Sequence, residues 1–155
     1  MDFKIERMTI NDLKKIHSTL EEDFDDFWNY NLFEQELKNS NSYFFVLKNN
    51  TEILGFAGFM IILDEADITN IVVKKDLRNK KLGSMLLNNL IEKIKTFDKI
   101  ETITLEVNEN NSFAIKMYEK FGFQHLGIRK NYYKDHTNAL IMTKYLKPLE
   151  VFIKN

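Results

Sequence analysis

Hydrophobic positions along the chain recur with a period of two in some stretches and of about 3.6 in others, which separates predicted strands from predicted helices. Apolar runs that end at Asn, Asp or Glu residues are typical of strands joined by turns. These runs predict strands at residues 3–7, 42–48, 53–63, 66–73, 100–107, 123–129 and 138–146.

A helical period is clearest over residues 82–94. It places Leu82, Leu86, Leu90 and Ile94 on one stripe, with Met85, Leu87 and Ile91 beside it.

Capping signals predict the other helices. Thr9 or Asn11 begins a first helix that continues to Leu20, and residues 21–36 form a second helix or one broken near 29–31. Asn111 or Ser112 caps a last helix, and the glycine at 122 ends it in the left-handed conformation.

The order of these elements predicts a mixed sheet. Three consecutive strands over residues 42–73 follow one another through short turns, so they are expected to be antiparallel. The next unit is strand, helix, strand, which normally makes a right-handed crossover between parallel strands. We therefore predict an α/β (α+β) fold, with a central sheet of about six to seven strands flanked by about four helices.

Composition narrows the class of protein. A length of 155 residues predicts a single domain over residues 1–155, and a 44% hydrophobic fraction suits a globular chain. Lys and Arg number 22 against 23 Asp and Glu, so no basic field favours nucleic acid as a partner. The absence of Cys excludes disulfides and thiolate catalysis and fits a reducing compartment.

The remaining composition signals concern metals and membranes. The three His residues lack metal-ligand spacing, so no metal is expected. The N-terminus carries charges where a signal peptide would be apolar, and no apolar run approaches membrane-spanning length. We expect a cytoplasmic protein with no membrane partner.

The junction before the helix at residue 82 is one candidate site, because a helix N-terminus offers unpaired N–H groups and a positive dipole to an anion. Three cations and a glycine lie there, which suits a phosphate or pyrophosphate, although by themselves they are more typical of an ordinary solvated basic loop. The junction consists of Arg78, Asn79, Lys80, Lys81, Leu82, Gly83 and Ser84.

A second candidate site is Glu106, near the end of a predicted strand. Strand alternation places Glu106 with Thr102 and Thr104 on one sheet face, and strand ends of open α/β sheets tend to border ligand crevices. The following helix returns Tyr118 within reach of that end. Glu106 is a candidate base, although the spacing alone favours a structural ion pair for Glu106 and core packing for Tyr118.

Several motifs in a fixed order resemble the GNAT acetyltransferases, and within them the ribosomal-protein-alanine N-acetyltransferases of the RimI type. The resemblance covers residues from about 53 to 142. It rests on the segments Leu63-Asp64-Glu65-Ala66, Asn70-Ile71-Val72-Val73, the loop 78–84, Leu105-Glu106-Val107, Asn111, Ala114-Ile115, Tyr118-Glu119, Phe121-Gly122-Phe123 and Arg129-Lys130-Asn131-Tyr132-Tyr133.

The resemblance implies a splayed sheet that holds acetyl-CoA between the strands 66–73 and 100–107. It implies that the main chain of Ile71, Val72 and Val73 binds the pantetheine arm, that the N–H groups of residues 79–84 hold the pyrophosphate, and that Asn111 contacts the thiol end. By the same resemblance Glu106 is the base and Tyr118 the acid. Tyr132 and Tyr133 lie where related enzymes close over a peptide substrate.

One residue departs from the family's pattern. Lys81 stands where the first glycine of the pyrophosphate loop is usual, and a positive φ there would cost about 1–2 kcal/mol. Its side chain adds a cation near the expected pyrophosphate.

The acceptor amine is open at this stage. An α-amino group titrates about 2.5 units below a Lys side chain, so a lone Glu deprotonates an α-amine more readily. A protein N-terminus, such as that of a ribosomal protein, is therefore favoured over a small amine (polyamine, amino acid or antibiotic) and over a non-catalytic acyl-CoA-binding module. The acidic, aromatic segment 21–28 either attracts a basic peptide or is a solvated helix face. The sequence does not indicate an oligomeric state.

Overall fold

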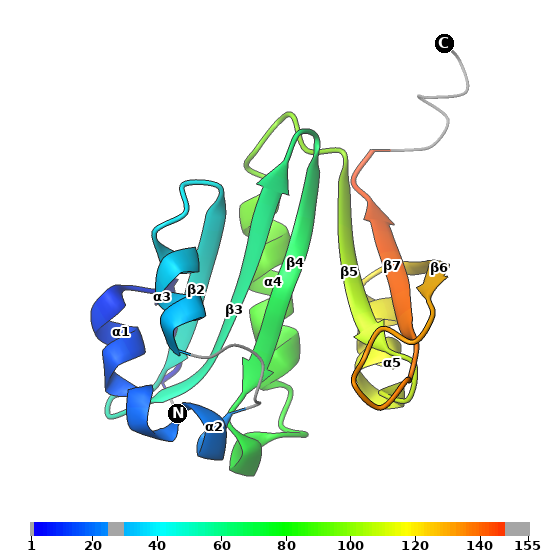
Figure 1. Ribbon diagram of the computed structural model, residues 1–155. Helices are drawn as coiled ribbons and strands as arrows, with labels where there is room; N and C mark the ends of the chain where they lie inside the picture. Colours follow the sequence, from blue (N-terminus) through cyan, green and yellow to red (C-terminus); the bar gives the residue numbers. More distant parts are fainter. Residues whose placement is uncertain (1, 25–29, 148–155) are drawn as a thin grey trace. The chain divides into compact units, whose positions relative to one another are not determined.

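The computed structural model describes residues 2–24 and 30–147, with seven strands in one mixed sheet of order β1-β2-β3-β4-β5-β7-β6 (Figure 1). The strands are β1 (Lys4–Arg7), β2 (Ser42–Lys48), β3 (Ile53–Ile62), β4 (Glu65–Val73), β5 (Thr102–Asn108), β6 (Gln124–Arg129) and β7 (Ala139–Tyr145). The helices are α1 (Ile10–Lys15), α2 (Leu20–Asp23), α3 (Tyr30–Leu37), α4 (Leu82–Ile94) and α5 (Ser112–Lys120), with single 3₁₀ turns at His17–Thr19 and Lys75–Leu77. This arrangement confirms the predicted fold class.

The chain forms two compact units, each described here by itself. Unit 1 comprises Met1–Ile61 and Thr69–Thr96, and unit 2 comprises Ile62–Ile68 and Phe97–Asn155. Strand β4 contributes its first residues to unit 2 and its last to unit 1. A single domain over residues 1–155 stays a prediction.

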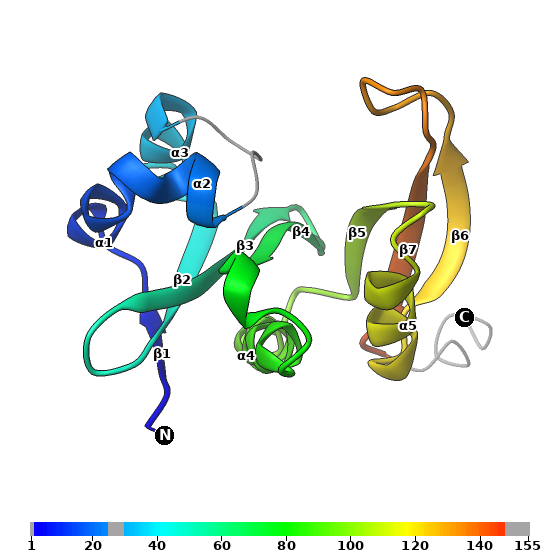
Figure 2. The same ribbon diagram turned by 90° about the horizontal axis from the view of Figure 1, so that it is seen from below.

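Unit 1 is a meander covered by helices on both faces. Strands β2 and β3 pair antiparallel, as the short turn between them predicted, and β1 pairs antiparallel with β2. Helices α1, α2 and α3 gather on one face of these strands and α4 on the other (Figure 2). An aromatic cluster fills the core, in which the Phe33 ring lies 5.3 Å from that of Phe44 and 5.1 Å from that of Phe56.

The first predicted helix is shorter in the structure than the pattern indicated. Thr9 caps α1 through a capping box with Asp12, because the Thr9 hydroxyl accepts from the Asp12 N–H and the Asp12 carboxylate accepts from the Thr9 N–H. The helix then ends at Lys15, and the expectation of one helix as far as Leu20 is wrong. Ser18 and Thr19 compete with helical hydrogen bonding at this position.

Helix α4 follows its predicted bounds and buries the predicted stripe. Leu86, Leu90 and Ile94 are fully buried, whereas Met85 is exposed at the helix surface. Gly55 on β3 lets this helix approach closely, since a Cβ there would lie 2.8 Å from the Val72 carbonyl oxygen and 3.2 Å from the Leu86 side chain.

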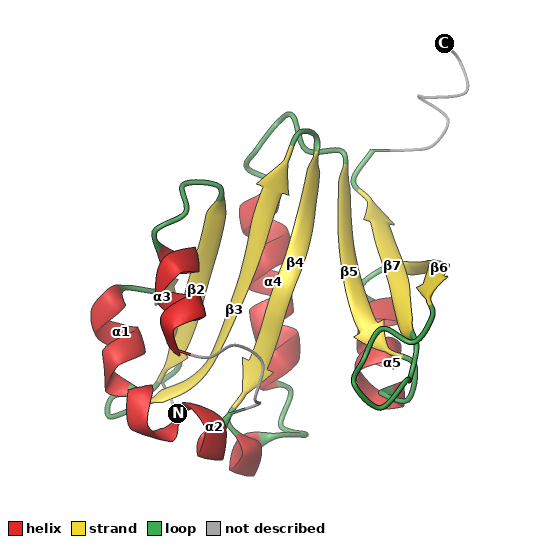
Figure 3. Ribbon diagram, in the orientation of Figure 1, coloured by secondary structure: helices red, strands yellow, loops and turns green. Residues whose placement is uncertain are grey.

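Unit 2 contains the parallel pair and the last hairpin (Figure 3). The first residues of β4 pair with Thr102–Thr104 of β5 in parallel, which confirms the predicted crossover, and β7 pairs antiparallel with both β5 and β6. Helix α5 ends as predicted: Gly122 has φ +91°, and the Phe123 N–H donates to the Tyr118 carbonyl 3.1 Å away.

None of the helices in residues 2–24 and 30–147 is long and apolar enough to cross a membrane.

Candidate functional site

The predicted anion loop of unit 1 has an unusual backbone. Asn79 and Lys81 both adopt positive φ, at 65° and 66°, immediately before α4 begins at Leu82. Lys81 therefore takes the left-handed conformation that the family's usual glycine would take at lower energy. The backbone strain predicted for Lys81 is therefore present in this structure.

The N-terminus of α4 suits an anion. Lys81 is the N-cap residue and makes no capping hydrogen bond through its side chain, so the first-turn N–H groups receive no side-chain acceptor from it. Arg78, Lys80 and Lys81 are exposed around this turn, and Gly83 and Ser84 are partly exposed within it. Main-chain donors at a helix N-terminus, with three cations nearby, match the chemistry of a pyrophosphate.

The end of β4 in unit 1 is tied to the same loop. The Arg78 Nε donates to the Val73 carbonyl oxygen at 3.2 Å, and the Lys74 N–H donates to the Leu54 carbonyl at 2.8 Å. Val72 is buried, while Ile71 and Val73 are partly exposed. These contacts fix the strand end whose main chain was predicted to bind the pantetheine arm.

In unit 2, Glu106 is the centre of a charged and aromatic group. Its Oε1 accepts from the Arg129 Nε at 2.8 Å, and its side chain is 28% exposed. The negative charge of Glu106 and a hydrogen bond to it raise the pKa of the Tyr132 hydroxyl. The Arg129 guanidinium also lies 5.8 Å above the Tyr132 ring.

Two further tyrosines connect this group to helix α5. The rings of Tyr132 and Tyr133 are perpendicular, with centroids 5.1 Å apart. Burial raises the pKa of Tyr118 to about 12, and Tyr133 adds to the shift. Tyr118 therefore stays protonated at neutral pH, as a proton donor must, and the structure places Glu106, Tyr132, Tyr133 and Tyr118 in one interacting series.

Asn111 has a structural task as well as its predicted one. Its side-chain oxygen accepts from the Ala114 N–H at 3.1 Å and caps α5, as the sequence predicted. The amide NH₂ group of the same side chain has the chemistry for a contact to a cofactor.

Sequence reasoning gave no role to Arg129, and it missed the contacts between polar side chains of β4 and β5 in unit 2. Thr104 donates to Glu65 at 2.9 Å, and burial raises the pKa of Asp67 to about 7. The alternation of side chains along β4 could have indicated these contacts, since it places Glu65 and Asp67 on one face of the sheet. The acidic segment 21–28 lies partly outside the described residues, which end at residue 24 and resume at 30.

Comparison with known proteins agrees with this geometry. The acetyltransferase (GNAT) family model matches residues 10–123. A Bacillus subtilis protein, provisionally named a ribosomal protein bS18-alanine N-acetyltransferase, is 34% identical over 140 residues, covering 89% of this chain and 92% of the relative. The Haemophilus influenzae ribosomal protein bS18-alanine N-acetyltransferase is 40% identical over 104 residues, covering 64% of this chain and 70% of the relative.

A solved structure gives the same result. The crystal structure of the ribosomal-protein-S18-alanine N-acetyltransferase from Escherichia coli matches with a TM-score of 0.84 at 30% identity, covering 95% of this chain and 96% of the other. The family match over residues 10–123 and the relative matched over 92% of its length show that this chain belongs to the acetyltransferase (GNAT) family, as an acetyl-CoA-dependent N-acetyltransferase.

Proposed function

We propose that this enzyme acetylates the N-terminal α-amine of a protein, with a ribosomal protein of the bS18 type as its substrate. The relatives named above carry that activity in their names, and the matches run along most of the chain. The observation that carries the proposal is the series Glu106, Tyr132, Tyr133 and Tyr118, which offers a carboxylate and a protonated hydroxyl in one group.

Glu106 is the proposed base. An α-ammonium group must lose a proton before its nitrogen can attack, and Glu106 accepts that proton directly or through one water. The Arg129 guanidinium donates to Oε1 of Glu106 at 2.8 Å and so holds the carboxylate in place. Tyr132 and Tyr133 are the proposed residues that hold the peptide beside Glu106.

Tyr118 is the proposed acid. Acetyl-CoA supplies the acetyl group as a thioester, and the leaving sulfur needs a hydrogen-bond donor. With a pKa of about 12, Tyr118 is less acidic than an ordinary thiol, which titrates near 8.5. Tyr118 therefore stabilises the leaving sulfur mainly by donating a hydrogen bond to it. This hydrogen bond becomes stronger as negative charge develops on the sulfur.

Most of the proposed cofactor residues belong to unit 1, and Asn111 belongs to unit 2. The N–H groups of Leu82, Gly83 and Ser84 and the side chains of Arg78, Asn79, Lys80 and Lys81 would hold the pyrophosphate. The main chain of Ile71, Val72 and Val73 would hold the pantetheine arm, a Val73 N–H would stabilise the carbonyl oxygen, and Asn111 would contact the thiol end.

An α-amine suits this site better than a lysine. A Lys side chain is about 300-fold less often neutral at pH 7 than an α-amine, so it asks more of a single carboxylate base. Because ribosomal proteins are made in the cytoplasm, we also propose a cytoplasmic location.

The test uses two peptides with the same basic sequence and the same internal lysine. One begins with a free alanine α-amine as bS18-type substrates do, and the other has that amine blocked. Intact-mass measurement with acetyl-CoA should show one added acetyl group on the free peptide alone, and fragmentation should locate it on the first residue. Acetylation of the blocked peptide, or of a polyamine in preference to both, would overturn the proposal.

A further inference from the structure

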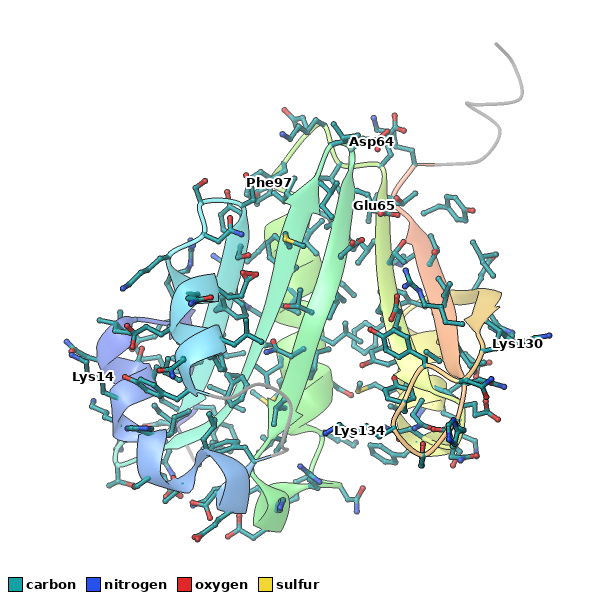
Figure 4. The ribbon with its side chains drawn as sticks, in the orientation of Figure 1. Lys14, Asp64, Glu65, Phe97, Lys130 and Lys134 are labelled. Atoms are coloured by element: carbon teal, nitrogen blue, oxygen red, sulfur yellow. The ribbon has the colours of Figure 1, made fainter. Side chains whose placement is uncertain are left out.

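Two acidic residues of β4 lie on the same sheet face as Glu106. Register pairs Glu65 with Thr102 and Asp67 with Thr104, so these side chains share the face that Glu106 joins two residues further along β5. Figure 4 labels Glu65 beside the turn at Asp64, where β4 begins.

A defined set of contacts holds this row. The Thr104 hydroxyl donates to Oε1 of Glu65 at 2.9 Å and lies 3.2 Å from the Thr143 hydroxyl on β7. Oδ1 of Asp67 is buried and has no hydrogen-bond partner among the described residues. A buried carboxylate oxygen without a hydrogen-bond partner disfavours the ionised form of Asp67.

The Asp67 carboxyl also interacts with Glu65. Two carboxylates can only accept, so the hydrogen bond between Asp67 and Glu65 forms when one of them carries a proton. Burial, the hydrogen bond and charge of Glu65 and the charge of Glu106 together raise the pKa of Asp67 to about 7, although Arg129 lowers it. Asp67 thus changes charge near neutral pH.

We propose that Asp67 is a positioning residue for Glu106: its carboxyl group, held against Glu65 on the same sheet face, adds or withholds one negative charge beside the base. The proposal rests on the proposed role of Glu106.

The charge matters at the proton-transfer step. As the substrate N–H bond breaks and an O–H bond forms on Glu106, the Glu106 carboxylate becomes neutral. An ionised Asp67 favours this change because the repulsion between the two negative charges disappears, and it attracts the incoming ammonium group. A neutral Asp67 does neither, so transfer should be faster when Asp67 is ionised.

The charged groups that shift the pKa of the Asp67 carboxyl are Glu65 of β4, Glu106 of β5 and Arg129 of β6. Tyr132 and Tyr133, in the loop after β6, interact with Glu106. Strand β7 contributes the uncharged Thr143, and β3 contains no titratable residue over Ile53–Ile62. Among the described residues no group of three or more His, Cys, Asp or Glu side chains is arranged to hold a metal.

The test compares the pH dependence of kcat/KM for wild-type enzyme and Asp67→Asn on one N-terminal peptide. The amide mimics the neutral carboxyl at all pH values, so the variant should lose about 3–10-fold near pH 8 and less than about 2-fold near pH 6. The KM for acetyl-CoA should not change. Asp64→Asn removes an exposed charge from the adjacent turn and should follow the wild-type profile. The substrate amine titrates identically in all three enzymes.

A second variant, Glu65→Gln, and an NMR titration without substrate distinguish a failure of the Asp67 proposal from a failure of the proposed function. Glu65→Gln retains the Thr104 acceptor but removes one charge, and it should move the inflection of Asp67 to lower pH. Carbon-13 NMR of the carboxyl groups should show one Asp titrating near pH 7 that is absent in Asp67→Asn. An equal loss of rate at both pH values, no loss at either, or no such NMR titration would overturn the role of Asp67. An enzyme that shows the NMR titration but acetylates no N-terminal peptide would instead overturn the proposed function.

Discussion

The loop before α4 in unit 1 and the β5 face of unit 2 contain polar groups of different kinds. The loop presents main-chain N–H groups, and its backbone is strained at Asn79 and Lys81 while its side chains are exposed. The β5 face presents side chains joined to one another, with Arg129 on Glu106 and Thr104 on Glu65. A substitution in the loop leaves its main-chain donors in place. A substitution on the β5 face removes a hydrogen-bonding group on which the neighbouring side chains depend.

The largest effect is expected at Glu106. Glu106→Gln keeps the size and one acceptor oxygen but removes the proposed base, so kcat/KM for an N-terminal peptide should fall by about 10²–10⁴-fold. The Kd for acetyl-CoA, measured by calorimetry, should stay within about 2-fold, because the residues proposed to bind the pyrophosphate and the pantetheine arm lie in unit 1. Glu119→Gln, at an exposed position on α5, is the matched control and should be unchanged. A weaker acetyl-CoA affinity in Glu106→Gln would contradict the proposal that the loop binds the cofactor and the β5 face carries out the chemistry.

Tyr118→Phe should have the next largest effect. It removes a hydroxyl that burial keeps protonated, and kcat should fall by about 10–10²-fold with a similar peptide KM. Because Tyr118 stays protonated over the pH range in which the enzyme can be assayed, it does not shape the pH dependence of the rate. The residual activity of Tyr118→Phe should therefore change with pH at alkaline values as the wild-type activity does. Tyr43→Phe, in unit 1, serves as the control. A loss confined to peptide KM would show that Tyr118 binds substrate rather than the leaving group.

Removing the positive charges of the loop before α4 should weaken acetyl-CoA binding without changing the rate of the chemical step. Arg78→Gln with Lys80→Gln should raise the Kd for acetyl-CoA by about 3–10-fold at low salt and by less at high salt, since exposed charges are screened. The single-turnover rate at saturating cofactor should not change. Lys93→Gln, exposed on α4, controls for net charge. A reduced single-turnover rate would show that the loop also takes part in the chemistry.

Lys81→Gly should have the smallest effect on activity and a measurable effect on stability. Glycine adopts the φ of 66° without strain, so the variant should gain about 1 kcal/mol and about 2–4 °C in Tm. Affinity for acetyl-CoA should change less than about 3-fold, because the main chain keeps its conformation. Scanning calorimetry and cofactor titration measure both. A lower Tm would indicate that the Lys81 side chain stabilises the loop more than its backbone strains it.

Local patterns predicted most of the fold. Apolar runs predicted β2 with its observed bounds, the helical stripe predicted α4, and Asn111 and Gly122 predicted the two ends of α5. The break after α1 was missed because it arises where Ser18 and Thr19 compete with a helix that the apolar spacing alone would continue.

The candidate site was predictable only in part. The position of Glu106 on its strand follows from alternation, but its contact with Arg129 depends on two strand registers that bring β6 beside β7 and β7 beside β5. The neighbours of Asp67 likewise depend on the parallel register with β5. Such registers join residues that are far apart in sequence, and no local pattern specifies them.

The most direct test of the account crosses the two regions in one double-mutant cycle. Single-turnover rate and acetyl-CoA Kd are measured for the wild type, Glu106→Gln, the Arg78→Gln Lys80→Gln pair and the combination of all three. The account predicts that the loop changes alter only Kd, that Glu106→Gln alters only the rate, and that the combined enzyme shows both effects additively within about 0.5 kcal/mol. A combined enzyme that departs from additivity by more than this, in either quantity, would contradict the division of labour between cofactor loop and catalytic face.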